Sequence, residues 1–94
     1  MEGRYLVLTR VKTDRSMLNT INKLAPIFSR TGALTYRLGS IITGESVRDE
    51  ILIVSYSSME QIEKAYDLLA NNSDYGHLVN NVTVNSRNII KLEF

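Results

Sequence analysis

His77 is the only histidine in the chain and the first residue to consider for acid–base chemistry. An imidazole acts as a general base when a carboxylate or carbonyl orients one of its ring nitrogens, and Asp74 lies three residues earlier. The alternative is a histidine in a surface or partly buried loop. We therefore take His77 as a candidate both for catalysis and for ligand binding.

Arg10 and Arg37 are charged residues inside two segments that otherwise resemble apolar strands. A guanidinium facing an enclosed space binds a carboxylate or phosphate through two hydrogen bonds, or stabilises an oxyanion. Alternatively, both side chains keep their heads in water or pair with Glu50 or Glu93. Both arginines are candidates for ligand binding, and Arg37 is also a candidate for catalysis.

Tyrosine is the commonest aromatic residue, with five copies in the chain. A phenol can line a pocket and offer its hydroxyl to a small aromatic ligand, although a core tyrosine with a satisfied hydroxyl is the simpler reading. Four tyrosines fit either description: Tyr36, Tyr56, Tyr66 and Tyr75. The ligand-binding set predicted from the sequence is Arg10, Tyr36, Arg37, Tyr56 and His77.

Composition argues against several other chemistries. The chain has no cysteine, so thiol catalysis and thiolate metal sites are excluded, and one histidine with scattered carboxylates has no ligand spacing. The serines lack a Gly-x-Ser-x-Gly context. The net charge is +1, with no basic arm, and residues 50–56 offer neither a cation nor a stacking platform for RNA. We expect no metal, no cofactor and no nucleic-acid partner.

Four strands are expected where β-branched and aromatic residues are bounded by turn residues. They fall at residues 5–11, 33–43, 50–56 and within residues 82–94. Gly39 lies inside the second strand and predicts a bulge or a close backbone approach.

Two amphipathic helices lie between these strands. The first has an apolar stripe over residues 17–28 and ends before Gly32; Pro26 should kink it or shorten its last turn. The second has its apolar residues on one side over residues 59–69, and residues 75–80 should form a short helical turn or loop.

The sequence also predicts how the helices begin. Thr13 or Asp14 can cap the first helix by accepting from its free N–H groups. Ser57 and Glu60 have the spacing of a capping box, in which the serine accepts from the Glu60 N–H and the carboxylate reaches back.

This order of elements predicts an α+β, ferredoxin-like β-α-β-β-α-β sandwich, with two helices on one face of a four-stranded antiparallel sheet. Both alternating sets of each strand contain large apolar side chains, for example Val7 and Leu8, or Ile53 and Val54. Helices can cover one face only, and an exposed apolar face of a sheet usually marks an interface. We therefore expect a homodimer, packed sheet to sheet.

Several segments resemble the dimeric α/β-barrel superfamily. The first helix and its exit, residues 24–28 and 31–33, look like the corresponding region of that superfamily. Residues 56–60, Ala65-Tyr66 and residues 72–75 are similar to its strand, Ser-x-Glu, helix and Asp-Pro-x-Tyr region. The resemblance implies a ferredoxin-like protomer that forms a barrel with its twin, in an uncharacterised branch related to small monooxygenase-like proteins.

The superfamily includes cofactor-independent monooxygenases, haem-degrading enzymes, isomerases and ligand-sensing modules. This chain has no tryptophan, so it lacks the Asn-Trp-His set of the haem-degrading relatives. The apolar sheet surface with isolated strand charges favours a small-molecule-binding protein whose ligand lies in a cleft between sheet and helices. Whether it is also a cofactor-independent, monooxygenase- or isomerase-like enzyme acting on an aromatic or oxygenated metabolite stays open. The alternative is a non-catalytic homodimeric interaction or ligand-sensing module.

The 94 residues are expected to form one domain, residues 1–94, in which partner burial would add to a small core. Apolar runs are far shorter than the roughly 20 residues of a membrane helix. The N-terminus lacks the apolar region of a signal peptide. These features predict a cytoplasmic protein with no membrane partner.

Overall fold

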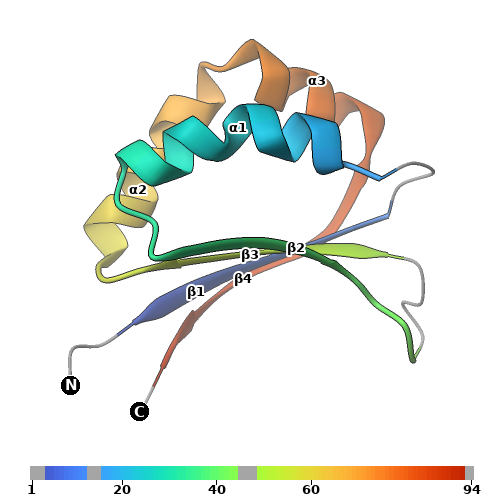
Figure 1. The fold of residues 1–94 in the computed structure, drawn as a ribbon, viewed down its shortest axis with the longest axis horizontal. Coiled ribbons are helices and arrows are strands. Elements are labelled where there is room, and N and C mark those ends of the chain that lie inside the picture. Colours follow the sequence, from blue (N-terminus) through green and yellow to red (C-terminus); the bar gives the residue numbers. More distant parts are fainter. Residues whose placement is uncertain (1–3, 13–15, 45–48, 93–94) are drawn as a thin grey trace.

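A computed structural model describes residues 4–12, 16–44 and 49–92. The elements follow in the order β1 (Tyr5–Lys12), α1 (Leu18–Arg30), β2 (Thr35–Ser40), β3 (Glu50–Tyr56), α2 (Met59–Ala70), α3 (Ser73–Asn81) and β4 (Thr83–Lys91). The helices form one layer and the strands a second layer beneath it (Figure 1).

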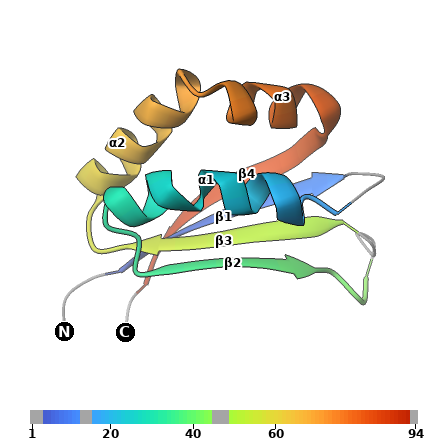
Figure 2. The same cartoon turned by 45° about the horizontal axis from the view of Figure 1, so that its top comes forward.

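The four strands form one antiparallel sheet in the order β2-β3-β1-β4 (Figure 2). β1 and β3 therefore lie side by side in the centre of the sheet, although β1 ends at Lys12 and β3 begins only at Glu50. This order, with both helical connections on the same face, is the ferredoxin-like fold expected from the sequence. The fold class is confirmed.

The registers correct one expectation about the sheet. β2 pairs with β3 without interruption from Thr35↔Ser55 to Ser40↔Glu50, so Gly39 introduces no bulge in this pairing. The irregularity lies instead between Arg10 and Val11, where β1 changes register with β4. β2 is also shorter than the 33–43 segment expected for it.

A buried carboxylate holds the start of α1. Glu50 is 7% exposed at the beginning of β3, and its Oε1 accepts from the Met17 N–H at 2.7 Å while Oε2 accepts from the Ser16 hydroxyl at 3.3 Å. An anion is stabilised where the first N–H groups of a helix have no partner within it. The caps expected from Thr13 or Asp14 lie outside the described residues.

The structure differs from the sequence-based expectation at both later helices: the capping residue of α2 is shifted by one position, and α3 is longer than expected. At α2 the capping serine is Ser58, which accepts from the Gln61 N–H at 3.3 Å, and Gln61 Oε1 accepts in return from the Ser57 N–H at 3.2 Å. The capping box is therefore displaced by one position from Ser57 and Glu60. The segment expected to be a short turn is the nine-residue helix α3, capped by Asn72.

The core lies between the sheet and the helices. α1 continues four residues beyond Pro26 and turns Ile21, Leu24, Ile27 and Phe28 toward the sheet. The other buried apolar residues come from β1, β3, α2 and the residue before α1: Val7, Val11, Met17, Leu52, Val54, Tyr56, Ile62, Ala65 and Leu69.

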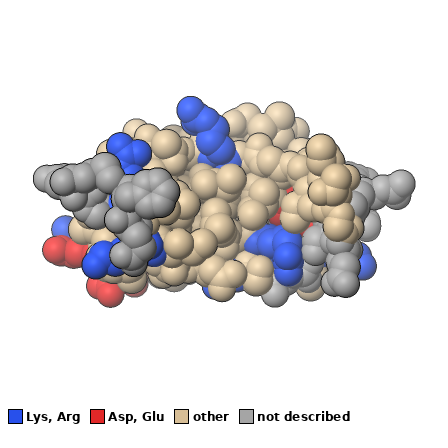
Figure 3. All heavy atoms as spheres, turned by 90° about the horizontal axis from the view of Figure 1, so that it is seen from below, with Lys and Arg blue, Asp and Glu red and all other residues tan. Residues whose placement is uncertain are grey.

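The opposite face of the sheet carries no helix in the described part of the chain (Figure 1). The pairs Leu8↔Ile53, Arg10↔Ile51 and Leu6↔Ile90 place these side chains on it, since residues paired across strands share a face. Figure 3 shows this face from below: Lys and Arg stand apart from one another, and residues of other types cover most of the middle.

Removing the Glu50 carboxylate should destabilise the fold. Glu50→Ala leaves the Met17 N–H without its acceptor, so we expect a loss of about 1–3 kcal/mol in the free energy of unfolding, measured by urea denaturation. Glu63→Ala, on the exposed side of α2, is the matched control and should change it by less than about 0.5 kcal/mol. Equal effects of the two substitutions would show that Glu50 does not anchor α1.

Candidate functional site

A small cavity lies between the helix-covered face of the sheet and the three helices. Its volume is ≈ 30 Å³, enough for a water molecule and much smaller than the roughly 300–1,000 Å³ of pockets that hold drug-sized ligands. Most of its wall is apolar: Val11, Met17, Ile21, Leu24, Phe28, Leu52, Leu78, Val79, Val82 and Val84. The polar or phenolic side chains that reach it are Thr9, Tyr66, Tyr75 and Arg87.

Arg87 organises these polar groups. Its Nε donates to Thr9 Oγ1 at 3.1 Å, and its Nη2 donates to the Tyr75 hydroxyl at 2.9 Å. Its Cζ lies 4.7 Å from the centre of the Tyr66 ring, in a cation–π contact. One guanidinium on β4 thus joins β1, α2 and α3 at the polar end of an otherwise apolar cavity. We call Thr9, Tyr66, Tyr75 and Arg87 the Arg87 cluster.

The register explains why these residues meet. Thr9 and Arg87 are directly paired between β1 and β4, so both side chains lie on the helix-covered face. Tyr75 is in the first turn of α3, which follows α2 after a short connection and passes over β4 (Figure 2). α3 therefore brings a phenol to the arginine that projects from the sheet.

The environment of Tyr66 favours its neutral form. Burial raises the pKa of the Tyr66 phenol, while the nearby charge of Arg87 and a hydrogen bond with the Thr9 side chain oppose that rise. Tyr66 is therefore a neutral hydrogen-bonding group at physiological pH.

Tyr36 and Tyr56 lie on the helix-covered face but their hydroxyls are already used. The Tyr36 hydroxyl donates to the Ile21 carbonyl at 2.7 Å, and its ring stacks on Phe28 with 4.8 Å between ring centres. Tyr56 is fully buried and its hydroxyl lies 2.7 Å from Thr31 Oγ1, at the end of α1. Neither residue lines the cavity, and both hold α1 on the sheet.

Arg10 and Arg37 lie on the other side of the sheet. Arg10 pairs with Ile51 and Arg37 with Ile53, and these positions belong to the face without helices. Arg37 is exposed and donates from Nη1 to the Tyr36 carbonyl at 3.0 Å. The buried Nε of Arg10 has no hydrogen-bond partner among the described residues. The sheet itself separates both arginines from the cavity.

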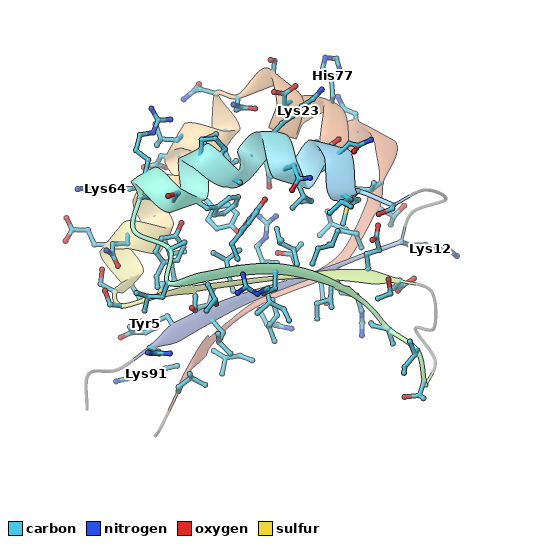
Figure 4. All side chains as sticks on the ribbon, viewed as in Figure 1. Tyr5, Lys12, Lys23, Lys64, His77 and Lys91 are labelled. Carbon is cyan, nitrogen blue, oxygen red and sulfur yellow. The ribbon has the colours of Figure 1, made fainter. Side chains whose placement is uncertain are left out.

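His77 lies on α3 and points away from the sheet (Figure 4). It is exposed, and it does not line the cavity. The five residues selected from the sequence therefore occupy three separate places: two under α1, two on the open face and one on the outer side of α3. Within the described residues, no group of three or more metal-ligating side chains comes together.

The cation that does reach the cavity, Arg87, was not selected from the sequence. It has the same signal as Arg10 and Arg37, a charge inside a strand-forming segment. Which face such a charge occupies depends on register, and the shift between Arg10 and Val11 leaves one extra residue in β4, between Val84 and Ser86, which interrupts simple alternation in β4. Tyr66 and Tyr75 were recognised as potential lining residues but could not be distinguished from core tyrosines.

Comparison with solved structures places the protein in the class of ferredoxin-like α+β proteins. A dimeric ferredoxin-like protein from an uncultured marine organism aligns with a TM-score of 0.77 at 13% identity, over 99% of this chain and 98% of the other. A second dimeric ferredoxin-like protein of marine origin aligns with a TM-score of 0.66 at 12% identity, over 99% and 92% of the two chains. SnoaB, a cofactor-independent oxygenase from Streptomyces nogalater, aligns with a TM-score of 0.75 at 11% identity, over 100% and 96%.

The particular family follows from the sequence. The model of the family described as "Domain of unknown function (DUF6854)" matches residues 3–92, and the chain belongs to this family. No curated protein sequence matches the chain significantly. The ferredoxin-like fold that the resemblance implied is shared with these neighbours. None of the helices in the described residues is long and apolar enough to cross a membrane.

The burial of Tyr36 should make stability fall in alkaline solution. Burial, followed by the neighbouring Tyr66 and Tyr56, raises the pKa of Tyr36 above its usual value. Above about pH 10 the phenol loses its proton in the unfolded chain but retains it in the folded protein, so the free energy of unfolding decreases as pH rises. Urea denaturation between pH 8 and pH 11 measures this slope.

Tyr36→Phe is the informative comparison for that slope. The substitution keeps the stacking on Phe28 but removes the hydrogen bond to Ile21, so the free energy of unfolding at neutral pH should fall by about 1 kcal/mol. Above pH 10 the free energy of unfolding of the variant should decrease less steeply than that of the wild type. The same slope in both proteins would show that Tyr36 does not contribute to the alkaline loss of stability.

Proposed function

We propose that this protein binds a small, largely apolar molecule in the cavity between its sheet and its helices. The observation that carries the proposal is the Arg87 cluster: a cation and three hydroxyl-bearing side chains meet at one end of a wall that is otherwise apolar. Ligand sites generally combine an apolar lining with a few polar groups that fix orientation. The SnoaB neighbour, which is a cofactor-independent oxygenase, supports a small-molecule function for this fold.

The cavity can widen on its α3–β4 side. Val79 of α3 and Val84 of β4 both line it and are 37% and 41% exposed. These two apolar side chains stand at the surface between a short helix and an edge strand. A ligand larger than ≈ 30 Å³ would enter there and move α3 outward.

Catalysis would use the same groups. If the protein is an enzyme of the monooxygenase or isomerase type, its substrate is an aromatic or oxygenated metabolite, and the Arg87 cluster stabilises the enolate or phenolate that such chemistry develops. His77, Arg10 and Arg37 remain predictions as site residues; the two arginines lie on the open face of the sheet, away from the cavity.

A thermal-shift screen tests ligand binding. We expect aromatic acids, phenols or quinones to raise the melting temperature of the wild type, since a ligand that binds only the folded state stabilises it. Val79→Phe, at the mouth of the cavity, should abolish the shift, while Leu68→Phe, exposed on α2 and outside the lining, should retain it. The absence of any shift in the wild type would refute the ligand-binding proposal.

A second candidate function is a homodimeric module that binds no ligand. The specific observation in its favour is the open sheet face, where Leu8, Ile53 and Ile90 lie together without a covering element in the described residues. A second copy packed on this face would cover them, and would also enclose the buried Nε of Arg10. The two neighbours described as dimeric ferredoxin-like proteins support self-association.

Light scattering at micromolar concentration tests the homodimer. The expected mass is about 21 kDa, twice the 10.7 kDa of one chain. Ile53→Lys on the open face should give the mass of one chain, because it would bury a charge between the sheets, whereas Leu68→Lys on α2 should leave the dimer intact. A wild type that runs as a monomer would disprove self-association through this face.

A further inference from the structure

We propose that the ligand of this cavity is a small carboxylate with an apolar body, and that Arg87 is the residue that selects its charge. This inference deepens the proposed ligand-binding function and rests on it. It follows from which hydrogen-bonding groups the Arg87 cluster uses internally and which it leaves for a ligand.

Arg87 has N–H groups that make no hydrogen bond within the Arg87 cluster. A guanidinium carries five N–H groups and accepts no hydrogen bond. Two are used, one from Nε to Thr9 and one from Nη2 to Tyr75, which leaves three without a partner among the described residues. Arg87 Cζ lies over the Tyr66 ring, and this cation–π contact adds to the two hydrogen bonds that position the guanidinium.

The hydroxyls of the cluster are donors as well. The Tyr75 oxygen already accepts from Arg87, so its own hydrogen is left to donate. The Thr9 oxygen accepts from Arg87 Nε, which leaves the Thr9 hydrogen to donate. Burial keeps the Tyr66 phenol protonated, so it too can donate. The cluster therefore presents donors and one positive charge.

Such a surface complements an anion that only accepts hydrogen bonds. A carboxylate has two acceptor oxygens that fit the edge of a guanidinium, whereas a neutral amide brings an NH₂ group that finds no free acceptor in the cluster. No Asp or Glu is present among the residues that line the cavity, so the charge of Arg87 has no carboxylate partner there. Arg87 is exposed, so water solvates its charge until the carboxylate of a ligand replaces that water.

The apolar lining of the cavity determines the chemistry of the rest of the ligand, which must be apolar. Val79, Val84 and Leu78 lie on the same α3–β4 side as Arg87, so an apolar body placed against them leaves its carboxylate at the guanidinium. Because the cavity measures ≈ 30 Å³, a short or single-ring body is favoured, and the Arg87–Tyr75 hydrogen bond is the contact that must yield as α3 moves to admit it.

Matched pairs of acids and amides test this inference. Titration of the ¹⁵N-labelled protein at pH 7 with benzoate and benzamide, and with butyrate and butyramide, compares the same apolar bodies with and without charge. We expect each acid to bind at least tenfold more tightly than its amide, and the Arg87 Nε–H resonance to shift with the acids.

Two substitutions separate the charge of Arg87 from charge in general. Arg87→Gln should weaken benzoate at least tenfold and bring it to the level of benzamide. Arg30→Gln removes the same charge from the exposed end of α1, outside the cavity lining, and should leave both affinities unchanged. The melting temperature and circular dichroism of Arg87→Gln show whether it is folded, and Arg87→Lys, which keeps the charge without the planar fork, gives an intermediate affinity.

The outcomes distinguish this inference from the proposed function. If benzamide binds as well as benzoate, or if Arg87→Gln binds benzoate as well as the wild type, the carboxylate inference is wrong while ligand binding stands. If neither acids nor amides nor the phenols and quinones of the thermal-shift screen bind the wild type, both proposals are refuted.

Discussion

The two-residue period of the strands is the constraint on which the rest of this structure depends. Successive side chains point to opposite faces of the sheet, and helices cover only one face of the described structure. Val7, Thr9 and Val11 therefore meet the helices, while Leu6, Leu8 and Arg10 face the other way. The core, the cavity and the open apolar face are three consequences of the same alternation.

Glu50 and Tyr56 lie at the two ends of β3 and attach α1 to the sheet. Glu50 accepts hydrogen bonds at the beginning of the helix, and the Tyr56 hydroxyl meets Thr31 at its end. Tyr36 adds a hydrogen bond to the middle of α1. On the other side of the cavity, α3 reaches β4 through the hydrogen bond between Tyr75 and Arg87. The hydroxyls of Tyr36 and Tyr56 are therefore engaged with α1, whereas the hydroxyl of Tyr75 is engaged with β4.

Much of the fold could be predicted because the signals are local. The spacing of apolar residues predicted the two amphipathic helices, and β-branched runs bounded by turn residues predicted the four strands in the right order along the chain. The errors occur where neighbouring residues offer equivalent chemistry. Ser57 and Ser58 can each cap a helix, and it is Ser58 that accepts from the Gln61 N–H, while the Gln61 side chain accepts from Ser57. α3 was underestimated because a nine-residue helix with Gly76 in its middle has little intrinsic tendency to form and is stabilised by packing.

Residue types alone determined that this chain has no thiol chemistry, carries an even balance of charge, and has more apolar strand surface than two helices can cover. Arg10, Arg37 and Arg87 all fall within segments in which the residue types predicted strands, although only the first two were taken as site candidates. Only the tertiary structure decided which arginine meets the cavity, because that choice depends on the face each side chain occupies and on the register shift beside Arg10. Arg10 and Arg37 lie on the open face, whereas Arg87 lies on the helix-covered face with Thr9, Tyr66 and Tyr75. A change of one residue in register moves every side chain of a strand to the opposite face of the sheet, and no local sequence signal indicates the register.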